Sequence, residues 1–263
     1  KIAVERKTKR PIINFFPEGG NLIAGIENNL GFKVTDLHGN GIALKGKIVD
    51  QHGKMVSPFE SYDFGLGKVT YTPRPNHTYY VSTTIEGTTE KYPLPVPLGR
   101  GYALSARNIG NSITLKVTSN TTNGVGGTML IGHIRGRTFF KRIEKSKGKN
   151  YTVKILTQDL EDGVAHFTLF TKTGEPVCER LVFVDNPYND VDLTLQTNTD
   201  EYAQREKAMV SLKISDKKGN PINGNLSASV FTIAGQNKFS SIKSWLLLNS
   251  DIRGTVPNPD FFF

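Results

Sequence analysis

The sequence predicts an all-β chain of tandem antiparallel, immunoglobulin-like β-sandwiches, followed by a short helical or loop extension. Three observations predict it: a turn motif that recurs between β-rich runs, apolar–polar alternation within those runs, and a spacing of roughly 85–95 residues between comparable points. A β-helix or a propeller would have shorter and more regular periods. The 26 Gly and 13 Pro residues also favour turns and strands over helices.

The recurring motif is an Asp followed three residues later by a Gly. It occurs at 36–39, 50–53 and 216–219, with a looser copy that begins with Thr at 171–174. Gly supplies the positive φ that a tight turn needs, and an Asp side chain accepts hydrogen bonds from the backbone just ahead of it. A chain punctuated in this way is a series of hairpins.

Residues 1–10 form a basic leader, and the first predicted sandwich spans 11–95. Apolar and polar residues alternate in Gly31–Asp36, as they do in a half-buried strand. The predicted strands of this unit are Ile12–Phe16, Gly31–Asp36, Ala43–Asp50, Lys68–Tyr71 and Tyr79–Ile85.

The second predicted sandwich spans 96–187 and follows a stiff, extended linker marked by Pro93, Pro95 and Pro97. Seven strands in about 90 residues are typical of an immunoglobulin-sized sandwich. They are Tyr102–Asn108, Ser112–Ser119, Gly127–Ile134, Arg137–Arg142, Tyr151–Leu156, Gly163–Phe170 and Val177–Val184.

The third predicted sandwich, 188–263, is truncated and ends in a helical tail. Its strand candidates are Val191–Asn198, Lys207–Ser215 and Leu226–Thr232, and from Ser240 the apolar residues take helical spacing. The sequence ends on three phenylalanines. We therefore expect the chain to be a fragment of a longer protein that contains further domains.

The formal net charge of +9 is interpreted mainly as a solubility charge, because the basic residues are scattered. Two basic clusters, at 6–10 and 141–149, lack the interleaved aromatics that single-stranded nucleic acid favours, so no nucleic-acid partner is expected. An anionic membrane surface or a polyanionic glycan remains an alternative. The longest apolar stretch is far shorter than the roughly 20 residues that span a bilayer, so no membrane insertion by this segment is expected.

No catalytic, metal or cofactor site is predicted, and we expect no enzymatic activity. Cys178 lies in a strand-like run and is interpreted as a buried, inert thiol. The carboxylates of 159–162 are interpreted as a solvated turn, with a weak Ca²⁺ site as the alternative. Gly124–Gly127 is interpreted as a flexible hairpin tip, since it lacks the features of a phosphate-binding loop. The five histidines have no partner at a metal-ligand spacing; they are His38, His52, His77, His133 and His166.

Four runs carry a resemblance to a known family: 15–25 (FFPEGGNLIAG), 46–53 (GKIVDQHG), 65–73 (GLGKVTYTP) and 246–254 (LLLNSDIRG). They resemble the macroglobulin-type β-sandwich domains of bacterial α2-macroglobulin-like proteins, above all large Bacteroidetes-type proteins with an outer-membrane receptor plug-like module. The Cys-Gly-Glu-Gln thioester motif of true α2-macroglobulins is absent, because Cys178 is followed by Glu179-Arg180. Covalent protease capture is therefore not implied.

The resemblance implies a non-catalytic scaffold segment of a larger bacterial cell-envelope protein, extracytoplasmic and periplasmic or outer-membrane associated in a Gram-negative bacterium. We expect it to present strand edges and loops to a protein or peptide partner. The alternatives are a carbohydrate-binding region of an outer-membrane uptake system and a fragment of a macroglobulin-like protease inhibitor. Tyr80 and Phe140 are the candidate contact residues, since adjacent aromatics on a strand place one ring on the surface.

Overall fold

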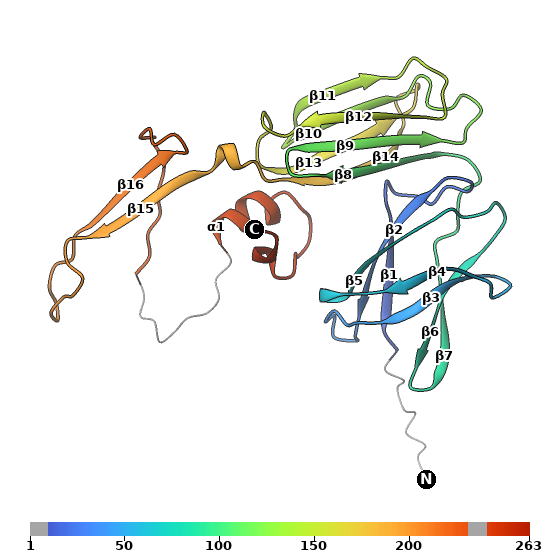
Figure 1. Cartoon of the computed structure of the whole chain (residues 1–263), viewed down its shortest axis with the longest axis horizontal. Helices are drawn as coiled ribbons and strands as arrows, with labels where there is room; N and C mark the ends of the chain where they lie inside the picture. Colours follow the sequence, from blue (N-terminus) through green and yellow to red (C-terminus); the bar gives the residue numbers. More distant parts are fainter. Residues whose placement is uncertain (1–9, 231–240) are drawn as a thin grey trace, which may run out of the picture. The chain divides into compact units, whose positions relative to one another are not determined.

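The computed structural model describes residues 10–230 and 241–263, and antiparallel strands make up most of its regular structure (Figure 1). This confirms the predicted all-β class. The chain divides into two compact units, which are described separately. One comprises Lys1–Ile109, Ile113–Ile155 and Ala165–Val182, and the other Gly110–Ser112, Leu156–Val164 and Phe183–Phe263.

The first sandwich consists of a three-stranded sheet, β1-β2-β5, and a four-stranded sheet, β4-β3-β6-β7. Buried side chains from both sheets form its core, in which the Phe32 and Phe59 rings stack with centroids 4.0 Å apart. The strands are β1 (Ile12–Pro17), β2 (Asn28–Thr35), β3 (Lys45–Asp50), β4 (Met55–Glu60), β5 (Leu66–Tyr71), β6 (Tyr79–Ile85) and β7 (Thr88–Pro93), with a 3₁₀ turn, η1 (Asp63–Gly65).

Two of these strands, β4 and β7, are absent from the strands expected from the sequence. Both lie at the edges of the four-stranded sheet. Their residues are mostly exposed, and each contains a proline, Pro58 or Pro93. Edge strands tolerate proline and polar residues because one side of the backbone needs no ladder partner, so the alternation that marks a half-buried strand is weak there.

The structure shows why glycine occurs twice in the Gly65-Leu66-Gly67 run. A Cβ on Gly67 would lie 2.2 Å from Cζ of Phe32, so only glycine leaves room for the buried ring. Gly65 has φ +73°, and a Cβ there would lie 1.9 Å from the carbonyl oxygen of Val34. Both glycines therefore permit close packing of β5 on β2.

The second sandwich consists of the sheets β11-β10-β13-β14 and β12-β9-β8. Its centre is apolar, with Leu115, Leu130 and Phe167 fully buried. All seven predicted strands are present: β8 (Tyr102–Asn108), β9 (Ser112–Ser119), β10 (Met129–Ile134), β11 (Arg137–Ile143), β12 (Asn150–Leu156), β13 (Gly163–Phe170) and β14 (Pro176–Val184).

The Gly124–Gly127 segment is a packed loop, which corrects its interpretation as a flexible hairpin tip. Val125 is fully buried, and its N–H donates to the carbonyl of Gly148 at 2.9 Å. A Cβ on Gly124 would lie 2.2 Å from that same carbonyl oxygen. The glycines let two loops approach closely, and the apolar Val125 anchors the segment in the core.

The three Asp turns share one geometry, which confirms the motif. In each turn, Oδ1 of Asp36, Asp50 or Asp216 accepts hydrogen bonds from the N–H groups two and four residues further on. The glycines at the third position after each Asp have φ between +79° and +87°. Hydrogen bonds from Asn40 and Asn220 are the main cause of the lowered pKa of Asp36 and Asp216.

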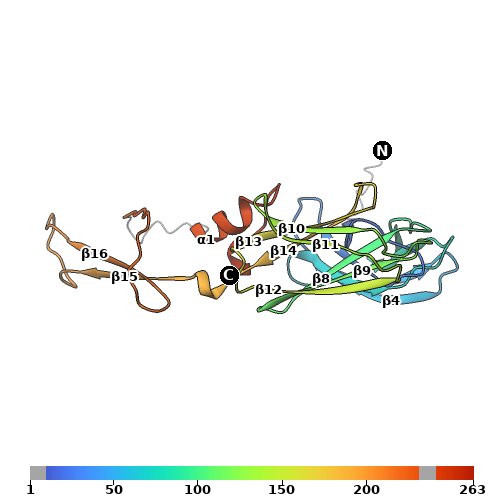
Figure 2. The same cartoon turned by 90° about the horizontal axis from the view of Figure 1, so that it is seen from above.

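The third predicted unit contains a two-stranded hairpin, β15 (Val191–Thr197) and β16 (Val210–Asp216), shown in Figures 1 and 2. The register places Leu193 opposite Ile214 and Leu195 opposite Leu212, so one face of the hairpin is aliphatic. The strand expected at Leu226–Thr232 does not form over 226–230, where Ser227, Ala228 and Ser229 give weak strand propensity; residues 231 and 232 lie outside the described residues. The division into three sandwich domains stays a prediction.

The predicted helical tail is present as α1 (Ile242–Ser244), a π turn η4 (Trp245–Asn249) and a 3₁₀ turn η5 (Pro259–Phe262); a further 3₁₀ turn, η2 (Pro187–Asn189), precedes β15. The Ser241 side chain caps α1 by accepting a hydrogen bond from the Ser244 N–H at 3.1 Å. Within the described residues, no helix is long and apolar enough to cross a membrane.

Candidate functional site

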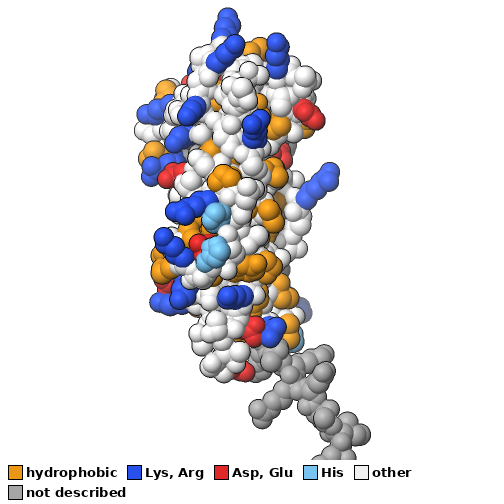
Figure 3. All heavy atoms as spheres, turned by 90° about the vertical axis from the view of Figure 1, so that its right-hand side faces the viewer, with side chains coloured by type: hydrophobic (Ala, Val, Ile, Leu, Met, Phe, Trp, Pro, Cys, Tyr) orange, Lys and Arg blue, Asp and Glu red, His pale blue; other side chains and the backbone are white. Residues whose placement is uncertain are grey.

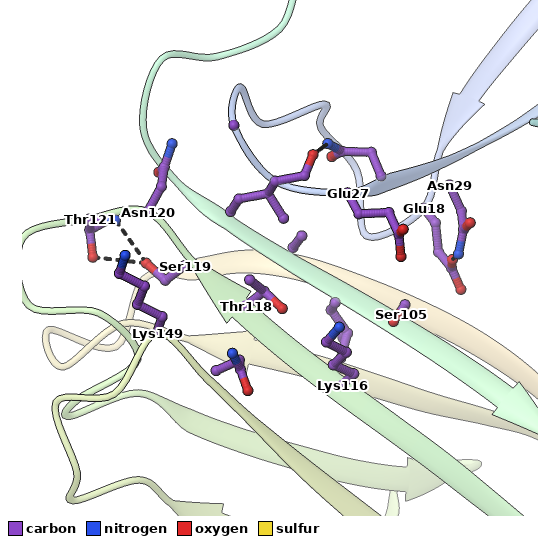
Figure 4. Close-up of a pocket in the computed structure, with 16 residues that line it drawn as sticks. Glu18, Glu27, Asn29, Ser105, Lys116, Thr118, Ser119, Asn120, Thr121 and Lys149 are labelled. Carbon is purple, nitrogen blue, oxygen red and sulfur yellow. Dashed lines mark hydrogen bonds between the residues drawn. The ribbon is translucent and has the colours of Figure 1, made fainter. Parts of the chain in front are cut away.

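A polar groove of about 390 Å³ lies where the first sandwich meets the second, within the larger unit. Figure 4 shows Glu18, Glu27 and Asn29 of the first sandwich along one side and Lys116, Thr118 and Lys149 of the second along the other. Carboxylate, amide, hydroxyl and ammonium groups therefore share one concave surface. Such a lining binds polar ligands through hydrogen bonds and charge.

Glu18 joins the two sandwiches at this groove. Its Oε1 accepts hydrogen bonds from the N–H of Ala106 in β8 at 3.0 Å and from Nε of Arg180 in β14 at 2.8 Å. Its Oε2 accepts one from Nδ2 of Asn29 in β2 at 2.6 Å. The Glu18 side chain is only 11% exposed, so its charge depends on these donors.

The FFPEGG run also covers the edge of strand β8, which lies at one side of its sheet. Gly19 has φ +85°, and a Cβ there would lie 3.0 Å from the carbonyl oxygen of Leu104. On its other side, the turn reaches β14, where the Glu179 N–H donates to the Gly19 carbonyl at 3.4 Å. Only glycine brings the turn this close to β8, and the turn thus shields backbone groups that an uncovered edge would expose.

Asn120 provides a second link between the sandwiches. Its Nδ2 donates to the carbonyls of Ala24 at 2.8 Å and Gly99 at 2.9 Å, and its Oδ1 accepts from the N–H of Gly101 at 2.8 Å. The segment after Pro93 is consequently bonded on both sides, because the Leu98 N–H also donates to the Leu22 carbonyl at 2.8 Å. The predicted extended linker is thus tied to both sandwiches.

Tyr80 and Phe140, the predicted contact residues, lie in different sandwiches. Tyr80 is half-buried in β6, opposite Pro93 of β7. Phe140 is half-buried in β11, opposite Gly132 of β10. Neither side chain lines the groove, and a role for them in ligand contact stays a prediction.

The structure brings together two histidines that sequence spacing does not connect. His133 and His166 face each other across β10 and β13, and their rings stack with centroids 4.9 Å apart. Nδ1 of His166 lies 3.5 Å from Oε1 of Glu179. In the described part of the chain, no group of three or more His, Cys, Asp or Glu side chains is arranged to hold a metal ion.

Cys178 is buried in β14, as predicted, and its Sγ donates to the Tyr102 carbonyl at 3.3 Å. Burial raises the pKa of the thiol to about 12. We therefore expect a thiol-specific reagent at neutral pH to modify the folded protein slowly and the urea-unfolded protein rapidly. The modification rate is followed by absorbance. Equal rates for the folded and the unfolded protein would show that the thiol is accessible in the folded state.

Glu144 fixes the basic loop between β11 and β12. Its Oε2 accepts from Nη2 of Arg142 at 2.7 Å, and its Oε1 accepts from the Ser146 N–H at 2.9 Å. The bond from Arg142, followed by those from Ser146, lowers the pKa of Glu144 from 4.5 to about 2. The carboxylate thus holds the start of the loop in place.

This pKa shift predicts an acid-dependent loss of stability. A lowered pKa in the folded state stabilises above pH 4.5, and the contribution disappears as the pH falls from 4.5 towards 2. Because Arg142 is 42% exposed, solvent screening keeps the expected effect at about 1 kcal/mol. Urea unfolding of wild type and Glu144→Gln should differ at pH 7 and converge near pH 2; a difference that is independent of pH would contradict the assignment.

Comparisons with known proteins identify no family. No protein-family model matches the chain, and no significant match is found among curated proteins. Among solved structures, native Escherichia coli α2-macroglobulin is 14% identical with a TM-score of 0.27, over 81% of this chain and 17% of that one. Bacterial invasin, an integrin-binding protein, is 16% identical with a TM-score of 0.28, over 82% and 48%. Salmonella α2-macroglobulin reacted with methylamine is 14% identical with a TM-score of 0.26, over 80% and 18%.

This chain therefore spans less than half the length of each of these three structures. The likeness concerns the β-sandwich fold alone.

Proposed function

We propose that this chain is a non-catalytic, extracytoplasmic scaffold segment of a larger cell-envelope protein. We place that protein in the periplasm or at the outer membrane of a Gram-negative bacterium, among Bacteroidetes-type macroglobulin-like proteins with a receptor plug-like module. The segment sets the spacing of neighbouring domains and presents strand edges and loops to a protein or peptide partner.

The observation that carries this proposal is the junction between the two sandwiches. Glu18 and Asn120 bond backbone or side-chain groups on both sides of it, and both residues are satisfied by several partners. Two sandwiches tied in this way act as one spacer instead of two independently moving domains.

The charge distribution agrees with a general interaction surface. On the face shown in Figure 3, Lys and Arg side chains are spread among acidic and hydrophobic ones. The edge strand β11 carries Arg137, Lys141 and Arg142, and charged side chains on an edge discourage unspecific strand pairing. A partner must therefore complement that edge to dock there.

Distance measurements between spin labels test the scaffold role. In a Cys178→Ser background, labels at His38→Cys and Lys154→Cys place one probe on each sandwich, at exposed positions. We expect a single narrow distance distribution, which broadens in Glu18→Ala/Asn120→Ala. A broad distribution in the protein with an intact junction would contradict a fixed spacer.

The non-catalytic part of the proposal has its own test. Assays with peptide, ester and glycoside substrates should show no turnover. Reproducible turnover that a single point substitution abolishes would overturn it.

A further inference from the structure

The polar groove between the first and second sandwiches, here called the junction groove, contains polar side chains that form no hydrogen bond within the described part of the protein. The hydroxyls of Ser105 and Thr118 and the amide of Asn150 line it, and the structure gives them no hydrogen-bond partner among the described residues. Its volume of about 390 Å³ lies in the range of sites that hold small ligands. Uncommitted hydroxyl and amide groups in a concave site suit a ligand rich in hydroxyls.

The same groove is bordered by positive charge. Lys116 and Lys149 line it, and Lys145 and Lys147 belong to the same loop as Lys149; all four are exposed. Within the described residues, none of these lysines pairs with a carboxylate, and the neighbouring Glu144 is already bound by Arg142. The loop therefore offers ammonium groups to an anion.

Of the two carboxylates in the groove, only one is uncommitted. Glu18 is neutralised by Arg180 and by two further donors, whereas Glu27 is exposed on the side of the first sandwich. An anionic ligand would therefore place its charges towards Lys116 and Lys149 and away from Glu27.

We propose that the junction groove binds an acidic oligosaccharide. The sugar hydroxyls form hydrogen bonds with Ser105, Thr118 and Asn150, and the sugar carboxylates pair with Lys116 and Lys149. The oligosaccharide then continues over Lys145 and Lys147 of the basic loop between β11 and β12. A flat anionic bilayer cannot enter a concave groove to reach Thr118, so a carbohydrate chain fits this surface better than a membrane. The scaffold role does not require a ligand in this groove. A failure to bind the oligosaccharide would therefore leave the scaffold proposal standing, and the reverse also holds.

Isothermal titration calorimetry with a short oligogalacturonate tests the proposal. The methyl ester of the same oligosaccharide is the uncharged control. We expect saturable binding of the acid that weakens with added salt, and little binding of the ester. Lys116→Gln/Lys149→Gln should weaken binding about tenfold, since two such contacts together amount to about 1.4 kcal/mol. Lys154→Gln, an exposed lysine of β12 outside the groove, is the matched control and should leave binding unchanged.

Two further variants separate the groove from general electrostatics. Ser105→Ala/Thr118→Val removes hydroxyls without changing charge and should weaken binding several-fold, whereas Glu27→Gln should strengthen it two- to threefold by removing a repulsive charge, roughly the size of an exposed ion-pair effect. Circular dichroism of each variant verifies folding. Equal binding of acid and ester, an equal effect of Lys154→Gln, or tighter binding to phosphatidylglycerol vesicles than to the oligosaccharide would overturn the proposal.

Discussion

Replacing Glu18 by alanine should lower the free energy of unfolding by about 2–4 kcal/mol, because the carboxylate accepts bonds from two sandwiches. The substitution leaves the Arg180 guanidinium, the Ala106 N–H and the Asn29 amide without their acceptor. Glu18→Gln keeps the shape but removes the charge, so it should cost less than alanine. Urea unfolding of wild type, Glu18→Ala and Glu18→Gln measures the three free energies of unfolding.

An exposed ion pair provides the control for this prediction. Glu60 pairs with Lys45 at 2.7 Å, but the lysine is 80% exposed, so Glu60→Ala should cost less than about 1 kcal/mol. A double-mutant cycle of Glu18→Ala and Arg180→Ala should give a coupling energy of about 1 kcal/mol or more, and Glu60 with Arg180 should give none. Equal losses for Glu18→Ala and Glu60→Ala would show that the junction does not stabilise the fold.

Replacing Phe32 by alanine should destabilise the first sandwich by about 3–5 kcal/mol. The ring is 2% exposed, stacks on Phe59 and fills the space beside Gly67, so its removal leaves a cavity in the core. Phe32→Leu retains most of the volume and should cost clearly less. Thermal and urea unfolding give both values.

Phe16 is the matched control, since it is the same residue type on the adjacent strand β1 but is 58% exposed. Phe16→Ala should change the free energy of unfolding by about 0.5 kcal/mol or less. If Phe32→Ala were as mild as Phe16→Ala, the described packing between the two sheets would be wrong.

The sequence predicts strands well where one face is buried. Tyr79–Ile85, Tyr102–Asn108, Ser112–Ser119 and Gly163–Phe170 form strands with the predicted bounds. In such strands every second side chain enters the core, and the burial leaves an alternating pattern. The edge strands β4 and β7 lack that pattern because their side chains are mostly exposed.

The junction groove and its bonds could not be predicted from the sequence. Glu18 and Arg180 are far apart in the chain, and they meet only because two separate sandwiches pack together. The stacked pair of His133 and His166 likewise depends on the register of β10 with β13. Local patterns carry no information on such pairings, although the run that contains Glu18 is one of the four that carry the family resemblance.

The Glu18-Gly19 turn lies against the edge of strand β8, and this contact matters while the protein is being synthesised on the ribosome. Domains generally fold in order as they emerge, so the first sandwich can fold before the second sandwich has emerged in full. The turn that shields β8 is then already in position when that strand appears. The nascent second sandwich is therefore protected from pairing with other chains at the stage when its own partners are still missing.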